Sequence, residues 1–120
     1  MINSRQKGAA FEREVAKALT AEGFPAKRGA QVNQGAIWGL SAADVVAPCL
    51  PDFHFECKRH GRARFDLDAA VDQAHRDAGT SLAAVVHRKD HCQMLVTMRF
   101  NEFCTLLRRS DFPTTPKTQP

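Results

Sequence analysis

Apolar residues near the start of the chain recur at helical spacing. Four of them, from Phe11 to Leu19, occupy positions i, i+4, i+7 and i+8, which predicts an amphipathic helix over residues 5–22. Ser4 has a side chain suited to capping the N-terminus of this helix, and Gly23 can end it in a left-handed conformation. The first element is therefore expected to be a helix with one buried face.

The patterns that follow are those of β-strands. Residues 24–28 and 44–47 are short extended runs, and residues 53–58 alternate between apolar and polar types, which is the period of a half-buried strand. We expect the odd-numbered residues of this last strand to face the core. Residues 29–41 are rich in glycine, glutamine and asparagine, and this composition predicts a mobile loop.

The second half of the chain is predicted to hold two helices and two buried strands, after a basic loop at residues 59–64. Asp66 and Asn101 are the expected N-caps of the helices, and Gly79 is the expected end of the first. The helices are expected at residues 67–78 and 102–109, and the strands at residues 82–87 and 93–98.

The order of these elements predicts an α/β fold, in which a mixed sheet is flanked by helices. The chain has 120 residues, of which 43% are hydrophobic and 25% charged, as in one ordinary globular domain. We expect this domain to span residues 1–109. The tail, residues 110–120, is expected to be disordered because it contains three prolines and few apolar residues.

Several classes of protein are excluded or disfavoured by composition. No apolar run approaches the roughly 20 residues of a membrane helix, and the N-terminal residues lack the apolar core of a secretory signal. The four cysteines show no CxxC spacing, which favours reduced thiols and a cytoplasmic location. The net charge of +4 agrees with a polyanionic partner but does not identify one.

Two carboxylates and a lysine form the candidate chemical site. Glu56 and Lys58 lie two residues apart on one predicted strand and so share a face, and Asp44 begins the preceding strand. If the two strands form a hairpin, the carboxylates meet and favour a shared divalent cation such as Mg²⁺. A lysine beside that cation can stabilise charge on a phosphate, which is equipment for phosphodiester hydrolysis.

Simpler interpretations of these residues remain open at this point. An exposed Glu–Lys pair is ordinary on a sheet surface, and Asp44 can be a turn residue. A zinc site formed by Cys49, His54, Cys57 and His60 is a further alternative, although it lacks a tight CxxC knuckle and the strand period points its middle two residues to opposite faces.

The motif Asp44…Glu56-Cys57-Lys58 resembles the core of the PD-(D/E)XK nuclease superfamily. The segment from Lys7 to Val15, with its Glu-Arg-Glu sequence, and the Gly23-Phe24 turn resemble the archaeal-type Holliday junction resolvases and phage relatives of similar size. This resemblance covers residues 5–60 in motif and residues 5–108 in element order. It implies a restriction-endonuclease-like α/β fold with a mixed sheet between helices.

The resemblance also implies a site. Its catalytic residues would be Glu12, Asp44, Glu56 and Lys58. Mg²⁺, with Mn²⁺ as a substitute, would be held by Asp44, Glu56 and the backbone carbonyl of Cys57, and through water by Glu12. Helix geometry independently favours Glu12 over Glu14, because Glu12 lies closer to the apolar stripe. Two departures from the family pattern are Ala43, where the superfamily name has proline, and the longer loop 29–41 with Trp38.

Basic residues near these acids are predicted to position DNA through its phosphates. They are Arg5, Lys7, Arg13, Arg28, Arg59, Arg62 and Arg64. By resemblance, the chain would be a structure-selective endonuclease of recombination or repair that cuts four-way junctions as a homodimer. Residues 93–98 and the last helix would supply the dimer surface. A restriction-type or repair nuclease, and a non-catalytic DNA-binding module, are the alternatives.

Overall fold

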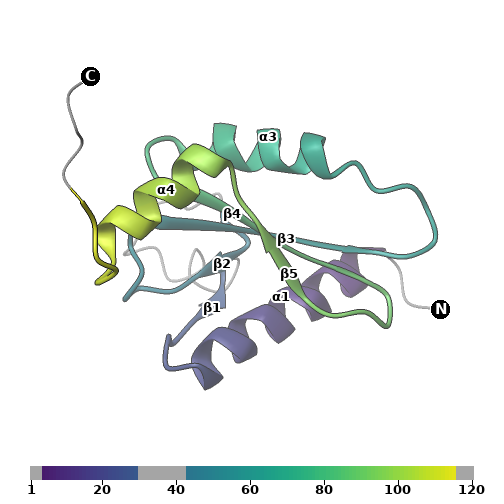
Figure 1. The fold of residues 1–120 in the computed structure, drawn as a ribbon. Helices are drawn as coiled ribbons and strands as arrows, with labels where there is room; N and C mark the ends of the chain where they lie inside the picture. Colours follow the sequence, from purple (N-terminus) through teal and green to yellow (C-terminus); the bar gives the residue numbers. More distant parts are fainter. Residues whose placement is uncertain (1–3, 30–42, 116–120) are drawn as a thin grey trace.

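The computed structural model describes residues 4–29 and 43–115, and the predictions made for residues 30–42, Trp38 included, and for residues 116–120 lie outside these ranges. Five strands form one sheet with three helices around it (Figure 1). In chain order the elements are α1 (Ser4–Ala21), β1 (Lys27–Arg28), β2 (Val45–Val46), β3 (Phe53–His60), α3 (Leu67–Ala78), β4 (Leu82–Lys89), β5 (Leu95–Thr97) and α4 (Phe100–Arg109).

The strands lie in the order β1-β2-β3-β4-β5. β1 pairs antiparallel with β2, β2 with β3, and β5 with β4. β3 and β4 are parallel, which requires the crossover that α3 provides. The predicted α/β class with a mixed sheet is therefore confirmed.

The two faces of the sheet are covered by different helices (Figure 1). On one face, Phe11 and Val15 of α1 are buried against Val45, Phe55 and other apolar residues of β2, β3 and β4. Burying side chains of this size stabilises the fold by roughly 1.5–3 kcal/mol each. The apolar stripe predicted for the first helix is thus the surface that packs on the sheet.

α3 covers the opposite face through small side chains. Ala70 and Ala74 are buried against Ala83 and Val85 of β4, so the helix approaches the sheet closely. Both predicted ends of α3 are confirmed: Asp66 caps it by accepting a hydrogen bond from the backbone N of Ala69 at 3.0 Å, and Gly79 follows it with a φ of 62°.

Two further expectations about helix ends are corrected. α1 already includes Ser4, so this residue is part of the helix rather than its cap. α4 begins at Phe100 with Arg99 at the N-cap position, and Asn101 lies within the first turn. The Asn101 side chain accepts from the backbone N of Glu102 instead. The asparagine therefore bonds locally, as a cap does, but the helix extends past it toward the N-terminus.

Two strands differ from their predicted environment. β3 was expected to be half-buried, but β2 and β4 flank it and helices cover both faces, so His54 and Glu56 are buried as well as Phe55. It also runs two residues further than predicted, which places the basic residues up to His60 in the strand. β5 was expected to be buried, yet it forms an edge where Leu95 and Val96 are 56% and 61% exposed.

The connection between α1 and β1 is tightly built. Gly23 has a φ of 100°, and the backbone N of Phe24 bonds the carbonyl of Leu19, which is the Schellman pattern of helix termination. Gly29 then donates its backbone N–H to the carbonyl of Asp44 at 2.7 Å. A Cβ on Gly29 would collide with the carbonyl of Ala43, so only glycine allows this approach. Among the described helices, none has the length and apolarity of a membrane span.

Candidate active site

Asp44 is fixed at the beginning of β2 by three hydrogen bonds. Its backbone N donates to the carbonyl of Phe55 at 2.9 Å, and its backbone carbonyl accepts from Gly29. Its side chain accepts from the backbone N of Cys57 at 2.9 Å. The predicted hairpin between β2 and β3 therefore forms, and it places the Asp44 carboxyl beside the Glu56 position.

Glu56 lies on the face of β3 that α3 covers, and it is only 3% exposed. Its carboxylate is 3.0 Å from Nε2 of His54, two residues earlier on the same face. Lys58 follows two residues later and is partly exposed. No hydrogen bond or ion pair joins its ammonium to another residue of the described ranges, so this charge remains available to a substrate or a water.

Glu12 reaches the same region from α1. Its carboxylate pairs with Arg28 of β1 at 3.1 Å, and its negative charge contributes to the field at Asp44. Glu14, two residues on, instead pairs with Arg88 of β4 at 2.7 Å. The choice of Glu12 over Glu14 from helix geometry thus agrees with the placement of the two side chains, and Arg28 lies next to the acids as predicted.

The Asp44 carboxyl is buried and lies in the field of two other acids. Burial raises the pKa of Asp44 from 3.8 to about 7, with further contributions from the charge of Glu56, the charge of Glu12 and a hydrogen bond with Glu56. Such a cluster is costly without a cation and is favourable around one. The donors are oxygens, as Mg²⁺ and Mn²⁺ prefer, so the residues present fit the expected metal.

Asp77 was not predicted as a candidate ligand and His54 was considered only for zinc, yet both lie close to Glu56. Ligand atoms of His54, Glu56 and Asp77 all lie within 4.8 Å of one another, so this group also has the geometry to hold a metal ion. Two signals in the sequence pointed to it. His54 shares the parity of Glu56 and Lys58 on the strand, and Asp77 lies one turn after Ala74 on the face of α3 that meets the sheet.

The zinc alternative is not supported by the geometry. His54 and His60 lie six residues apart on one strand, about 20 Å in extended chain, which is too far for one ion. Cys49 is exposed in the turn before the strand. Burial, with the nearby charges of Asp44, Glu12 and Glu56, raises the pKa of the Cys57 thiol well above its ordinary value, whereas zinc requires a thiolate.

The predicted DNA contacts divide into two sets. Lys7 and Arg59 both pair with Asp90, at 3.3 and 2.9 Å, and these contacts lower the pKa of the Asp90 carboxyl. Three further residues are exposed, namely Arg13 on α1 and both Arg62 and Arg64 between β3 and α3. The side chain of Arg5 lies outside the described part of the chain.

A mixed five-stranded sheet between helices, with carboxylates and a lysine on two adjacent strands, defines the class of PD-(D/E)XK nucleases. Residues 3–115 match the model of a family described as "Phage putative PDDEXK endonuclease", and the chain belongs to this family. The superfamily and the restriction-endonuclease-like fold inferred from the motifs are thereby confirmed. No curated protein and no solved structure matches the chain.

Proposed function

We propose that the chain is a divalent-metal-dependent endonuclease that cuts branched DNA, with the four-way junction as its main substrate. The observation that carries the proposal is the meeting of Glu12, Asp44 and Glu56 near Lys58; burial, together with the charges of Glu56 and Glu12, raises the pKa of Asp44 to about 7. Membership of an endonuclease family supports DNA as the substrate class.

In this proposal Asp44, Glu56 and the Cys57 carbonyl hold the metal, and Glu12 supports it through a water. Bound Mg²⁺, or Mn²⁺ in its place, would supply Lewis acidity and a water of lowered pKa for phosphodiester hydrolysis. The ammonium of Lys58 stabilises the negative charge that develops on the phosphate oxygens. Arg28, held by Glu12, keeps guanidinium donors beside the acids, where a phosphate of the substrate can bind.

The second part of the proposal is a C₂ homodimer, because a symmetric junction requires two cuts. The edge strand β5 and the adjoining helix α4 carry the exposed apolar residues Leu95, Val96, Phe100 and Phe103. Both faces of β5 are uncovered, and its outer edge offers unpaired backbone groups to a second copy. Two such edges pairing antiparallel would continue the sheet across the dimer.

The test compares single-turnover cleavage of a four-way junction, a flap and a linear duplex, with Mg²⁺ and with a chelator. We expect junction cleavage that depends on metal and exceeds duplex cleavage. Glu56→Ala and Lys58→Ala should each reduce cleavage by at least about 10²–10³-fold while junction binding is retained. Glu22→Ala, an exposed acid at the end of α1, is the matched control.

Each alternative has its own result in this experiment. Equal cleavage of junction and duplex would replace the junction resolvase with a restriction-type or repair nuclease on the same core. Binding of all three DNAs without any cleavage would favour a non-catalytic DNA-binding module. Unchanged cleavage by either site variant would refute the residue assignment, and a monomer under native conditions would refute the paired-cut mechanism.

A further inference from the structure

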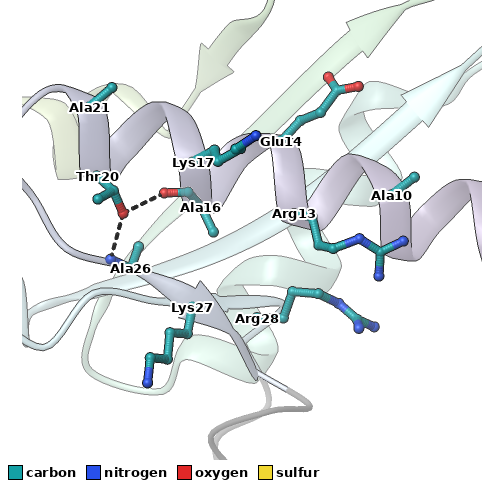
Figure 2. Close-up of a pocket in the computed structure, with 10 residues that line it drawn as sticks. All are labelled: Ala10, Arg13, Glu14, Ala16, Lys17, Thr20, Ala21, Ala26, Lys27 and Arg28. Atoms are coloured by element: carbon teal, nitrogen blue, oxygen red, sulfur yellow. Dashed lines mark hydrogen bonds between the residues drawn. The ribbon is translucent and has the colours of Figure 1, made fainter.

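Two hollows lie next to each other along α1, on the side where the helix meets β1. The first has a volume of about 690 Å³ and is lined by residues from Ala10 to Ala21 of α1 and by Ala26, Lys27 and Arg28 (Figure 2). The second, of about 560 Å³, is lined by residues near the start of α1 and by Arg59 of β3. Ala10 and Arg13 line both, so the two hollows adjoin at these residues, and together they are called the joined hollows below.

The first hollow is strongly cationic. Its lining contains Arg13, Lys17, Lys27 and Arg28, and its single acid is Glu14. Glu14 pairs at 2.7 Å with Arg88, which lies outside the hollow, so its charge is already balanced. Arg13, Lys17 and Lys27 are exposed and form no ion pair within the described ranges. Figure 2 shows the side chains of Arg13 and Arg28 extending toward the same end of the hollow.

The second hollow continues the positive charge toward the start of α1. Lys7, Arg13 and Arg59 are its charged lining residues. Asp90 pairs with both Lys7 and Arg59, so one acid balances two cations there. A net positive charge therefore runs along the full length of the joined hollows, and its natural partner is a chain of regularly spaced anions.

The walls of this surface belong to rigid elements. The Thr20 hydroxyl donates to the carbonyl of Ala16 at 2.8 Å and accepts from the backbone N of Ala26 at 3.1 Å (Figure 2). These bonds tie the last turn of α1 to the chain that enters β1. Lys17 and Lys27 are therefore presented from a helix and a strand that are held together, and a ligand would bind to a formed surface.

The hollow also leads directly to the acidic cluster. Arg28 lines the first hollow and pairs with Glu12 at 3.1 Å, so one side chain borders both regions. From Lys7 to Lys17 the helix advances about 15 Å, at 1.5 Å per residue. This length corresponds to about four base pairs of duplex at 3.4 Å each along one strand.

We propose that the joined hollows bind the phosphate backbone of a DNA arm that leaves the acidic site along α1, with Lys17 and Lys27 as backbone contacts. The proposal rests on DNA as the substrate of the proposed nuclease and adds a surface to it. Neither lysine belongs to the set of DNA contacts predicted from the sequence. The contacts are to phosphates and carry no base specificity.

The test is the salt dependence of binding to labelled duplex and junction DNA, without divalent metal. In a Lys17→Gln/Lys27→Gln variant, the negative slope of log K, the association constant, against log salt should become shallower by about 2. Binding should weaken about 60-fold at about 0.1 M salt. The matched control is Arg76→Gln/Arg108→Gln, which removes the same two charges from the exposed faces of α3 and α4. It should bind with the wild-type slope.

A Lys17→Arg/Lys27→Arg variant keeps both charges and controls for structural effects of substitution at these positions. It should bind as the wild type does. Wild-type slope and affinity in the Gln variant would overturn the proposal, as would equal losses in the Gln variant and its control. Because binding is read without metal, these results do not depend on cleavage. Failure of the nuclease proposal would instead appear as the absence of metal-dependent cleavage by the wild-type protein, whatever the two lysines do.

Discussion

The two faces of β3 carry different kinds of side chain, apolar on one face and polar or charged on the other. Toward α1, Phe53, Phe55 and Cys57 contribute to an apolar cluster. Toward α3, the strand presents His54, Glu56 and Lys58, and Glu56 is 3% exposed where Phe55 is 6% exposed. Similar burial therefore has opposite effects on the free energy of folding. Burial of the phenyl ring is favourable, whereas burial of the carboxylate is unfavourable unless charged or hydrogen-bonding partners compensate for the lost water.

The largest expected effect on stability comes from a substitution on the apolar face of β3. Phe55→Ala should lower the free energy of unfolding by about 3–5 kcal/mol, because it removes a buried ring and leaves a cavity. The matched change on the other face, Glu56→Gln, should not destabilise the metal-free protein, since the amide can still bond His54 and one charge beside Asp44 is lost. Chemical denaturation of both variants measures this contrast. Equal losses in the two variants would remove the distinction between the faces.

A smaller effect tests whether every buried acid belongs to the site. Glu102 of α4 is buried and accepts from the backbone N of Ala83 at 3.3 Å, and it does not contribute to the charge that acts on Asp44. Glu102→Ala should cost about 1–3 kcal/mol, because the buried N–H of β4 loses its partner. Denaturation and single-turnover cleavage separate the two kinds of acid. We expect the stability to fall and the cleavage rate per folded molecule to remain within about threefold.

The smallest effect concerns Asp44 and pH. Its pKa is raised by burial from 3.8 to about 7, so between these values the folded state keeps a proton that the unfolded state has released. The metal-free protein should therefore lose stability as the pH rises from about 4 to about 7, by roughly 1–2 kcal/mol at this partly exposed carboxyl. Mg²⁺ should restore it most strongly at the upper end of that range.

Thermal denaturation with and without Mg²⁺ across this range provides the measurement. Asp44→Asn should flatten the pH dependence and abolish the metal effect. Asp111→Asn, at an exposed carboxylate beyond α4, should leave both in place. A pH profile of the Asp44→Asn variant that matches the wild type would show that the cluster does not couple folding to protonation.

Local signals predicted much of this molecule because they act over a few residues. The helix at residues 67–78 was placed correctly from its flanking Asp66 and Gly79, whose backbone preferences are intrinsic. The hairpin between β2 and β3 followed from the strand period and from the number of residues between Asp44 and Glu56. The parity of β3 then placed Glu56 and Lys58 on one face.

The remaining features depend on packing between distant elements, which no local pattern encodes. The alternation of apolar and polar residues along β3 is compatible with a polar face that is exposed to solvent or with a polar face that is buried. Only the position of α3 distinguishes these two arrangements. The approach of Asp77 to His54 depends on the same helix. For β5, an apolar run is compatible with burial or with an exposed edge, and the order of strands in the sheet decides between them.

The long parallel register between β3 and β4 has a consequence for how this family can diverge. Eight consecutive residues, from Phe53 to His60, pair with the eight from Leu82 to Lys89. Insertion or deletion of one residue within β3 would exchange the two faces, turning phenyl rings toward α3 and the Glu56 carboxylate into the apolar cluster. Homologues should therefore differ in this strand by substitution alone, and length changes should accumulate in the segments around it.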